Sequence, residues 1–283
     1  MGPEADRDLD AVGCDLGRVR SVSCAIHTTG EALAAGVLAA EAPVVVCAEE
    51  HSYPAPGWAQ ALIGAHRGPW VAVGGVLENA NPDTMLSWAH LFTDFGPAVS
   101  PAPAGEAREL PGHHTAYKRA ALLAYGDRLG RCLEVEWMLQ EDLRRAGGRL
   151  YLEPRAVSRH LNVSRLASVL RSEFHGGRSF AANRAWISDW SLLHRLALVP
   201  AIPLVFAVRV RRVLRDVRRA RPSLLPRLLP ALSLGLAVNC LGQAVGCSLG
   251  HGGAARRRVS IELRRHRHLH PRDRAARPRA TGA

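Results

Sequence analysis

The chain has 283 residues, of which 47% are hydrophobic, so it can bury the core of one large domain or of a domain with an appendage. Its formal net charge of +12 comes almost wholly from arginine, because Lys118 is the only lysine. Six cysteines are spread out without a CxxC pair, which argues against a structural zinc site and a disulfide framework. The opening residues MGPEADRDLDAVG are acidic and lack an apolar run, so they predict no signal peptide.

Segments typical of strands and of helices alternate between residues 18 and 180. Helices that end at glycine, such as the one before Gly126, follow the usual preference at helix C-termini. This alternation predicts an α/β sandwich. The predicted strands are 19–26, 44–48, 70–77, 149–154 (stopped by Pro154) and 156–160, and the predicted helices are 29–42 (capped by Thr29), 57–66, 116–126 and 134–148.

Acidic and imidazole side chains follow a short apolar strand in the stretch VVVCAEEHSYPAPGW, residues 44–58. Glu49, Glu50 and His51 stand where the chain leaves that strand. Ligands of open α/β sheets bind beyond the carboxyl ends of strands. Carboxylate and imidazole groups at such an edge suit a divalent cation bound to a phosphate. Alternatively, the three residues mark a solvated boundary between strand and turn.

The composition changes after about residue 186. Residues 196–208 carry no charge but include two prolines, and residues 228–250 carry no charge over a length that can cross a bilayer. Gly242 and Gly246 form a small-xxx-small pair suited to a packed membrane helix. The sequence thus predicts a membrane-associated helical hairpin over 186–252; a buried pair of soluble helices is the alternative. Arginine blocks flank both sides, so the orientation stays open, and a re-entrant or interfacial hairpin would suit them.

Arginines crowd residues 209–222 and the last thirty residues. Basic blocks bind nucleic acid or anionic membranes. No aromatic platform or recognition motif accompanies this charge, so a nucleic-acid partner is not predicted. Residues 253–283 are predicted to be a basic disordered tail.

Four stretches, in order, resemble the family 2 glycosyltransferases of the GT-A fold. VVVCAEEHSYPAPGW resembles the segment around their Asp-X-Asp motif, and WVAVGGVLENANP resembles the strand that follows it. LPGHHTAYKRAALLAYG resembles their acceptor-side loop, and LEVEWMLQEDLRRAGGRLYLEPRAVSRH resembles the helix with the catalytic carboxylate and the strands after it. The resemblance implies a partial GT-A sandwich over 1–185, with a mostly parallel sheet and without the family's N-terminal nucleotide-binding half.

The same resemblance implies a metal site. Glu49 and His51 match the two ligand positions of Asp-X-Asp, Glu50 lies between them, and His160 matches a histidine near the metal. The implied cofactor is Mn²⁺ or Mg²⁺, which neutralises the diphosphate leaving group of a sugar nucleotide. His160 is alternatively an ordinary histidine at a strand end.

The resemblance also implies a base for the acceptor hydroxyl. Glu136 matches the catalytic carboxylate, with Glu134 as the second candidate. Either carboxylate could instead only favour the helix macrodipole.

The substrate-binding residues implied by the resemblance include Arg178, whose guanidinium suits a diphosphate. Alternatively, Arg178 faces the membrane surface. The other implied residues are Trp58, Gly112, His113 and His114, of which His114 replaces the family's usual asparagine.

The resemblance therefore implies an inverting glycosyltransferase at the cytoplasmic face of the cell membrane. Its partners would be a nucleotide-sugar donor and a lipid-linked, saccharide or small-molecule acceptor. The alternative is a non-catalytic, membrane-associated relic of such an enzyme that binds a partner.

Overall fold

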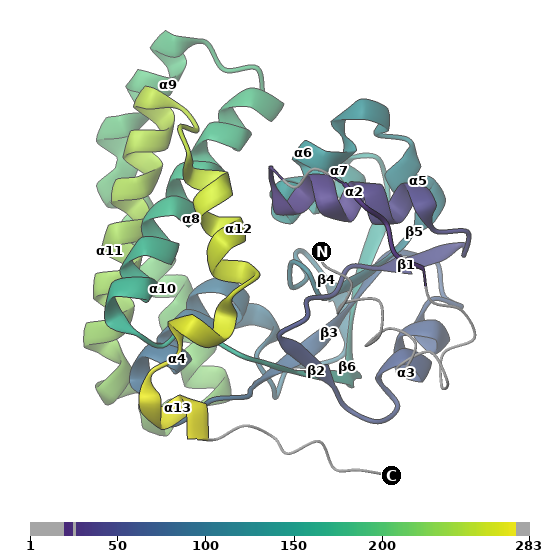
Figure 1. Ribbon diagram of the computed structural model, residues 1–283, viewed down its shortest axis with the longest axis horizontal. Helices are drawn as coiled ribbons and strands as arrows, with labels where there is room; N and C mark the ends of the chain where they lie inside the picture. Colours follow the sequence, from purple (N-terminus) through teal and green to yellow (C-terminus); the bar gives the residue numbers. More distant parts are fainter. Residues whose placement is uncertain (1–19, 25–26, 276–283) are drawn as a thin grey trace.

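The computed structural model describes residues 20–24 and 27–275 of the chain (Figure 1). The segment tested for a signal peptide and the last residues of the basic tail lie outside the described residues. Of the strand predicted over 19–26, residues 20–24 are described, and they form no strand.

Six strands form one mixed sheet with the order β1-β5-β3-β6-β2, and β4 pairs with β6. Only β3 and β6 run parallel; every other pairing is antiparallel. The expectation of a mostly parallel sheet is therefore not met, because hydrophobic patterns report where strands occur but not their direction. The strands are β1 (Val44–Val46), β2 (Ser52–Pro54), β3 (Trp70–Asn79), β4 (Gly105–Ala107), β5 (Thr115–Lys118) and β6 (Arg149–His160).

Strand β6 is continuous across Pro154, where the sequence predicts a break. Gly74 pairs with Leu152, whereas Val76 pairs with Val157, so β6 has extra residues at this point. Such a bulge leaves residues outside the hydrogen-bond ladder, which is where a strand tolerates proline. The bulge lets β6 continue to His160, whose position matters for the site.

Helices cover both faces of the sheet (Figure 1). Val76 and Leu150 pack with Leu133 and Leu139 on one face, whereas Val73 packs with Leu62 and Ala156 on the other. The expected α/β sandwich is confirmed at this level. The helices are α2 (Thr29–Ala39), α5 (Arg119–Leu123), α6 (Leu129–Glu134) and α7 (Glu136–Arg145) against the first face and α3 (Trp58–Ala65) against the second.

Three local predictions need correction. The N-cap of α2 is Thr28, whose hydroxyl accepts a hydrogen bond from the Glu31 amide, and not Thr29. The residues predicted to open the helix 116–126 belong instead to β5. Val135, with φ −133° and ψ 68°, divides the helix predicted over 134–148 into α6 and α7. This break separates Glu134 from Glu136.

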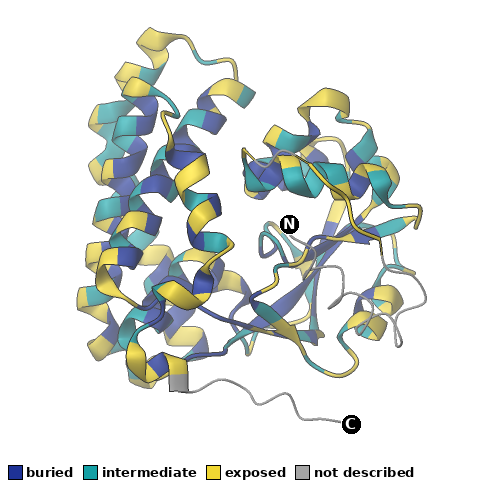
Figure 2. Cartoon of the chain, in the orientation of Figure 1, coloured by how far each residue is buried: buried dark blue, intermediate teal, exposed yellow. Residues whose placement is uncertain are grey.

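Long helices form a second layer beside the sheet. α8 and α11 pack closely because a Cβ on Gly242 would lie only 2.1 Å from the Phe174 carbonyl oxygen, and one on Gly246 only 2.4 Å from that of Arg178. Figure 2 shows buried positions along the facing sides of these helices. The layer contains α4 (Met85–Phe95), α8 (Leu166–Ile187), α9 (Leu192–Leu198), α10 (Ile202–Ala220) and α11 (Leu225–Leu249).

Two helical stretches, Leu192–Ala220 and Pro222–Leu249, are each long and apolar enough to cross a membrane, with a mean hydropathy of 1.6. No residue in the most apolar part of the first is buried, whereas 44% of that part of the second is buried within the protein. Length and composition thus make both compatible with membrane association, and neither defines a side.

The segment predicted to be a disordered tail is helical in its described part. α12 (Ala254–Glu262) packs against α8, and α13 (Pro271–Ala275) follows a short 3₁₀ turn, Arg265–His268. Val259, Ile261 and Leu269 are buried and anchor this segment. Apolar burial outweighs the repulsion between its arginines, which composition alone did not indicate.

Candidate functional site

Strand pairing brings the predicted metal ligands together. Ser52 of β2 pairs with His160 at the end of β6, and the Leu161 amide donates to the His51 carbonyl at 3.0 Å. On the other side, the Cys47 amide donates to the Thr115 carbonyl at 3.1 Å, which places the end of β1 beside the loop before β5. Side chains from three separate segments therefore meet at one edge of the sheet.

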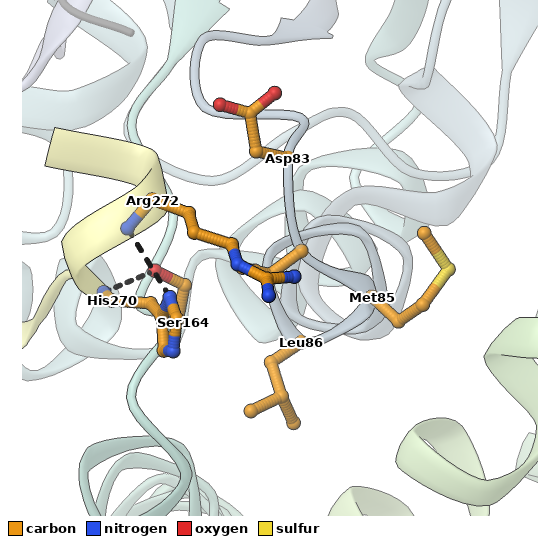
Figure 3. A pocket seen from close by; sticks show the side chains of 7 residues that line it. Asp83, Met85, Leu86, Ser164, His270 and Arg272 are labelled. Atoms are coloured by element: carbon orange, nitrogen blue, oxygen red, sulfur yellow. Dashed lines mark hydrogen bonds between the residues drawn. The ribbon is translucent and has the colours of Figure 1, made fainter. Parts of the chain in front are cut away.

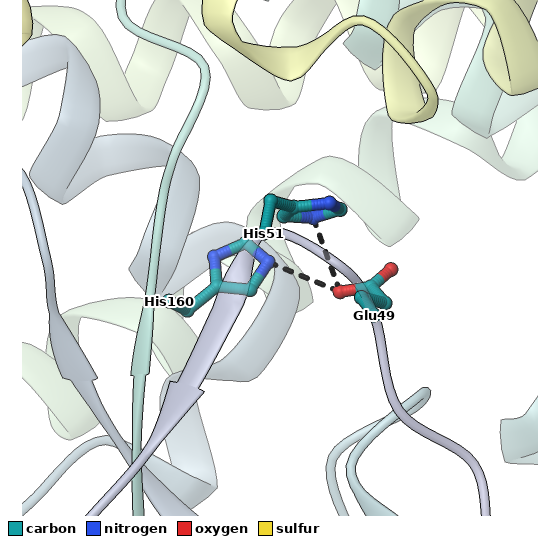
Figure 4. Close-up of side chains that lie close together, drawn as sticks. All are labelled: Glu49, His51 and His160. Atoms are coloured by element: carbon teal, nitrogen blue, oxygen red, sulfur yellow. Dashed lines mark hydrogen bonds and ion pairs between the residues drawn. The ribbon is translucent and has the colours of Figure 1, made fainter. Parts of the chain in front are cut away.

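The Glu49 carboxylate lies at the centre of this group (Figure 4). Its Oε2 atom is 3.2 Å from Nε2 of His51, 3.2 Å from Nε2 of His160 and 3.3 Å from Nε2 of His114. The ligand atoms of Glu49, His51 and His160 all lie within 4.8 Å of one another. One carboxylate and two imidazoles at this spacing can hold a metal ion.

A second set of hydrogen bonds fixes the ring of His160. The Asn162 amide nitrogen donates to Asn79 Oδ1 at 3.0 Å, so Asn162 Oδ1 is the acceptor that faces His160 Nδ1 at 2.8 Å. His160 thus carries its proton on Nδ1 and directs the lone pair of Nε2 at the Glu49 carboxylate. Two acceptors at 3.2 Å need a cation or a proton between them. This arrangement fits a metal ion.

The pKa values show where a proton resides when no metal is bound. Burial lowers the pKa of His160 to about 4, so its Nε2 stays unprotonated at neutral pH. Burial also disfavours the charged form of His51, but the carboxylates of Glu49 and Glu50 outweigh it and raise the pKa of His51 to about 9. Hydrogen bonds from His114 and His51 outweigh burial and hold the pKa of Glu49 well below its ordinary value. The group therefore holds one proton on His51, and a divalent cation would take its place.

Glu136 is buried at the start of α7 and is bound through both oxygens. The His113 amide donates to Oε1 at 2.6 Å, and the Tyr117 hydroxyl donates to Oε2 at 2.7 Å. Gln140 in turn donates to the Tyr117 hydroxyl at 3.1 Å. Gly112 lies against this carboxylate, since a Cβ there would be 3.9 Å from Oε1 of Glu136. These contacts fix the orientation of the carboxylate.

The loop 112–114 joins the two carboxylates. His113, in the left-handed region with φ 59°, places its ring Nδ1 3.6 Å from Glu136 Oε1. The next residue, His114, reaches the Glu49 carboxylate from the same loop. Glu136 and the Glu49–His51–His160 group are therefore connected through the side chains of His113 and His114.

The other predicted site residues lie elsewhere. The side chain of Glu50 is 59% exposed, and its Oε1 atom lies 3.6 Å from Nδ1 of His51. Glu50 therefore does not belong to the group of Glu49, His51 and His160 that could hold a metal ion. Glu134 accepts a hydrogen bond from the Gly30 amide at 2.9 Å, at the N-terminus of α2. Trp58 packs with Leu62 on the opposite face of the sheet. Arg178 donates to the Gly250 carbonyl at 2.9 Å, on the connection between α11 and α12.

Two residues of the C-terminal segment join the site without having been predicted. Nη2 of Arg265 lies 2.9 Å from Nε2 of His51 and also contacts the Glu262 carboxylate, which is 3.7 Å from the same nitrogen. Local sequence offered no signal for these residues, because Val259, Ile261 and Leu269 do not follow helical spacing and become buried only against distant segments.

A cavity of about 430 Å³ lies away from this group, between the start of α4 and α13 (Figure 3). In it the His270 amide donates to Ser164 Oγ at 2.8 Å. None of the predicted site residues lines this cavity. Its lining residues are Asp83, Thr84, Met85, Leu86, Ser164, His270 and Arg272.

Comparisons of the chain with protein-family models, curated proteins and solved structures found no match. The fold and the site define a mixed α/β protein with a pair of apolar helices and a Glu/His/His group that could hold a metal ion.

Proposed function

We propose that the chain is a membrane-associated, inverting glycosyltransferase of the family 2 type. It would transfer a sugar from a nucleotide-sugar donor to an acceptor hydroxyl at the cytoplasmic membrane face. The observation that carries this proposal is the juxtaposition of a possible metal-binding group with a buried, oriented carboxylate through the loop 112–114. The two apolar helices support the membrane location.

Glu49, His51 and His160 would hold the cation. Two imidazoles in the set favour a softer ion such as Mn²⁺ over Mg²⁺. When bound, the ion supplies charge neutralisation for the diphosphate leaving group.

Glu136 would accept the proton of the acceptor hydroxyl on a carboxylate oxygen. The acceptor oxygen forms its bond to the anomeric carbon as the bond from that carbon to the diphosphate breaks, with inversion. The Tyr117 hydroxyl and the His113 amide hold the carboxylate in place during this step.

The test uses the full chain in detergent or vesicles with a panel of labelled sugar nucleotides and Mn²⁺ or Mg²⁺. Glu136→Gln keeps an acceptor for the Tyr117 hydroxyl but removes the base, so we expect transfer to fall by roughly a thousandfold. Glu134→Gln is the matched control, since this carboxylate is bound to a backbone amide of α2, and its activity should stay within a few fold.

Two results would contradict the proposal. One is a folded wild-type chain that shows no metal-dependent transfer or hydrolysis with any donor. The other is transfer by Glu136→Gln at the wild-type rate.

A specific observation supports the second candidate, a non-catalytic relic that binds a partner. Nη2 of Arg265 lies 2.9 Å from Nε2 of His51, so a guanidinium group stands beside one of the possible metal ligands. For such a protein, Glu136→Gln would leave the glycan or product profile of the cell unchanged while wild type and variant bind the same partner.

A further inference from the structure

Arg265 is a buried cation with unused hydrogen-bond donors. Its side chain is 4% exposed, and only Nη2 has a hydrogen-bond acceptor among the described residues, the Glu262 carboxylate; the same atom lies 2.9 Å from Nε2 of the protonated His51. Nε and Nη1 are buried without a hydrogen-bond partner among the described residues. Leaving donors of a buried charged group unpaired destabilises the folded state. An acceptor at this place would remove that destabilisation.

Arg258 lies seven residues earlier, on α12, and is partly exposed. No hydrogen bond or ion pair within 4 Å joins it to a described residue. Burial disfavours its charge, but the carboxylates of Glu262, Glu134, Asp94 and Glu49 raise its pKa. Its guanidinium is thus a positive charge in the field of these four carboxylates, without a hydrogen-bonded partner among the described residues.

The carboxylates nearby do not forbid an anion. Glu262 is already held by Arg265. Burial raises the pKa of Asp94, although the charges of Arg258 and Arg265 oppose this. Arg258, Arg265 and the protonated His51 together face the carboxylates of Glu262, Glu134, Asp94 and Glu49, so an anion would be bound by the unpaired guanidinium donors and not by an excess of positive charge.

We propose that Arg265 and Arg258 form a phosphate-binding site on the C-terminal segment, facing the Glu49–His51–His160 group. Guanidinium groups bind phosphate oxygens through forked hydrogen bonds. The ligand would be a phosphate or diphosphate group, held by the metal group on one side and by the two arginines on the other. This inference rests on the proposed function where it takes that group to be the diphosphate of the donor. A lipid phosphate offers the same chemistry.

The experiment measures binding of inorganic pyrophosphate to the full chain in detergent, by equilibrium dialysis and without added divalent cation. We expect Arg265→Gln and Arg258→Gln each to weaken binding by about tenfold or more, since a hydrogen bond to a charged group is worth about 1.5–3 kcal/mol. Arg256→Gln is the matched control, because Arg256 is exposed on the same helix and carries the same charge. Its affinity should stay within about twofold, since exposed charges contribute little.

The proposal is overturned if wild type does not bind pyrophosphate, or if neither Arg265→Gln nor Arg258→Gln weakens binding. It is also overturned if these two variants and the control Arg256→Gln weaken binding equally. The last result would indicate only the general positive charge of the segment. Arg265→Lys keeps the charge but loses the fork, so intermediate binding is expected. If circular dichroism shows that Arg265→Gln does not fold, the pyrophosphate binding of Arg265→Lys and Arg258→Gln tests the proposal.

A second arm identifies the source of the phosphate. Sedimentation with phosphatidylcholine vesicles, with and without phosphatidic acid, is compared for wild type and Arg265→Gln. If the variant loses both pyrophosphate affinity and the preference for phosphatidic acid, the site is assigned to a lipid phosphate; if it loses pyrophosphate affinity but keeps the lipid preference, the site is assigned to a soluble phosphate or diphosphate. If pyrophosphate binding depends on the arginines but the chain transfers no sugar, the proposed function is refuted and the phosphate site is retained. If the chain transfers sugar but its pyrophosphate binding does not depend on the arginines, the proposed function is retained and the phosphate site is refuted.

Discussion

At the scale of single residues, the site depends on where protons lie. Asn162 holds the His160 proton on Nδ1, which leaves Nε2 free toward Glu49. His51 is the group that still carries a proton at neutral pH, because the Glu49 and Glu50 carboxylates raise its pKa to about 9. A metal ion must displace that proton.

We therefore expect Mn²⁺ affinity to rise with pH. Because the bound proton competes with the metal below about pH 9, the apparent association constant should increase by about tenfold per unit between pH 6 and 8. Titration of free Mn²⁺ by electron paramagnetic resonance measures this. His51→Gln should bind more weakly and with little pH dependence, since the pKa of His160, at about 4, is too low to contribute. A wild-type affinity that is constant over this range would contradict the assignment.

At the scale of elements, α8 and α11 meet around a buried carboxylate. The Asn239 amide donates to Glu173 Oε2 at 2.9 Å, and Gly235 lies against this side chain. Burial and the neighbouring Asp94 charge raise the pKa of Glu173 to about 8. Glu173 is thus mainly protonated at neutral pH and costs stability when it ionises.

The stability of the fold should fall as pH rises from about 4.5 toward 8, because the unfolded chain loses this proton at lower pH than the folded one. Glu173→Gln mimics the protonated form and should raise the unfolding temperature at pH 8 by on the order of 5 °C, with little change at pH 5. Calorimetry in detergent measures the effect. Glu78→Gln, at a side chain that is 39% exposed, is the control and should leave the pH profile unchanged. Equal shifts at both pH values would refute this role.

At the scale of the whole molecule, the apolar helices carry exposed leucine and valine side chains that the rest of the protein does not cover. Leu204 is 67% exposed, Val208 50%, Leu234 43% and Leu241 57%. Exposed apolar side chains in this number on one pair of helices are typical of an interface with a membrane or with a partner. Membrane association, with which the length and hydropathy of these helices are compatible, would supply that cover.

Replacing Leu204, Val208, Leu234 and Leu241 together by serine should move most of the chain from the membrane fraction to the soluble fraction. Leu38→Ser with Ile63→Ser is the control, because both residues are more than 60% exposed but lie on helices that cover the sheet. Fractionation followed by an alkaline wash gives the readout. An unchanged membrane fraction for the fourfold variant would contradict the membrane role of these helices.

Much of the site follows from local sequence signals. The end of an apolar strand indicated Glu49 and His51, because apolar patterns and turn residues act over a few neighbours, whereas His160 came from the resemblance. The glycine spacing in 242–246 likewise indicated a packed helix. The assignment of Glu136 came from the resemblance, and its role remains a prediction.

Only the tertiary structure decided the rest. Strand direction, the meeting of His114 with Glu49, and the contact of Arg265 with His51 across 214 residues all depend on packing between distant segments. The basic segment after residue 253 shows why: its composition favours disorder, whereas burial of a few apolar side chains against α8 and the sheet folds it over the site. Composition and spacing determined which groups are available, and long-range packing determined which of them meet, because the free energy of burial depends on neighbours that the local sequence does not contain.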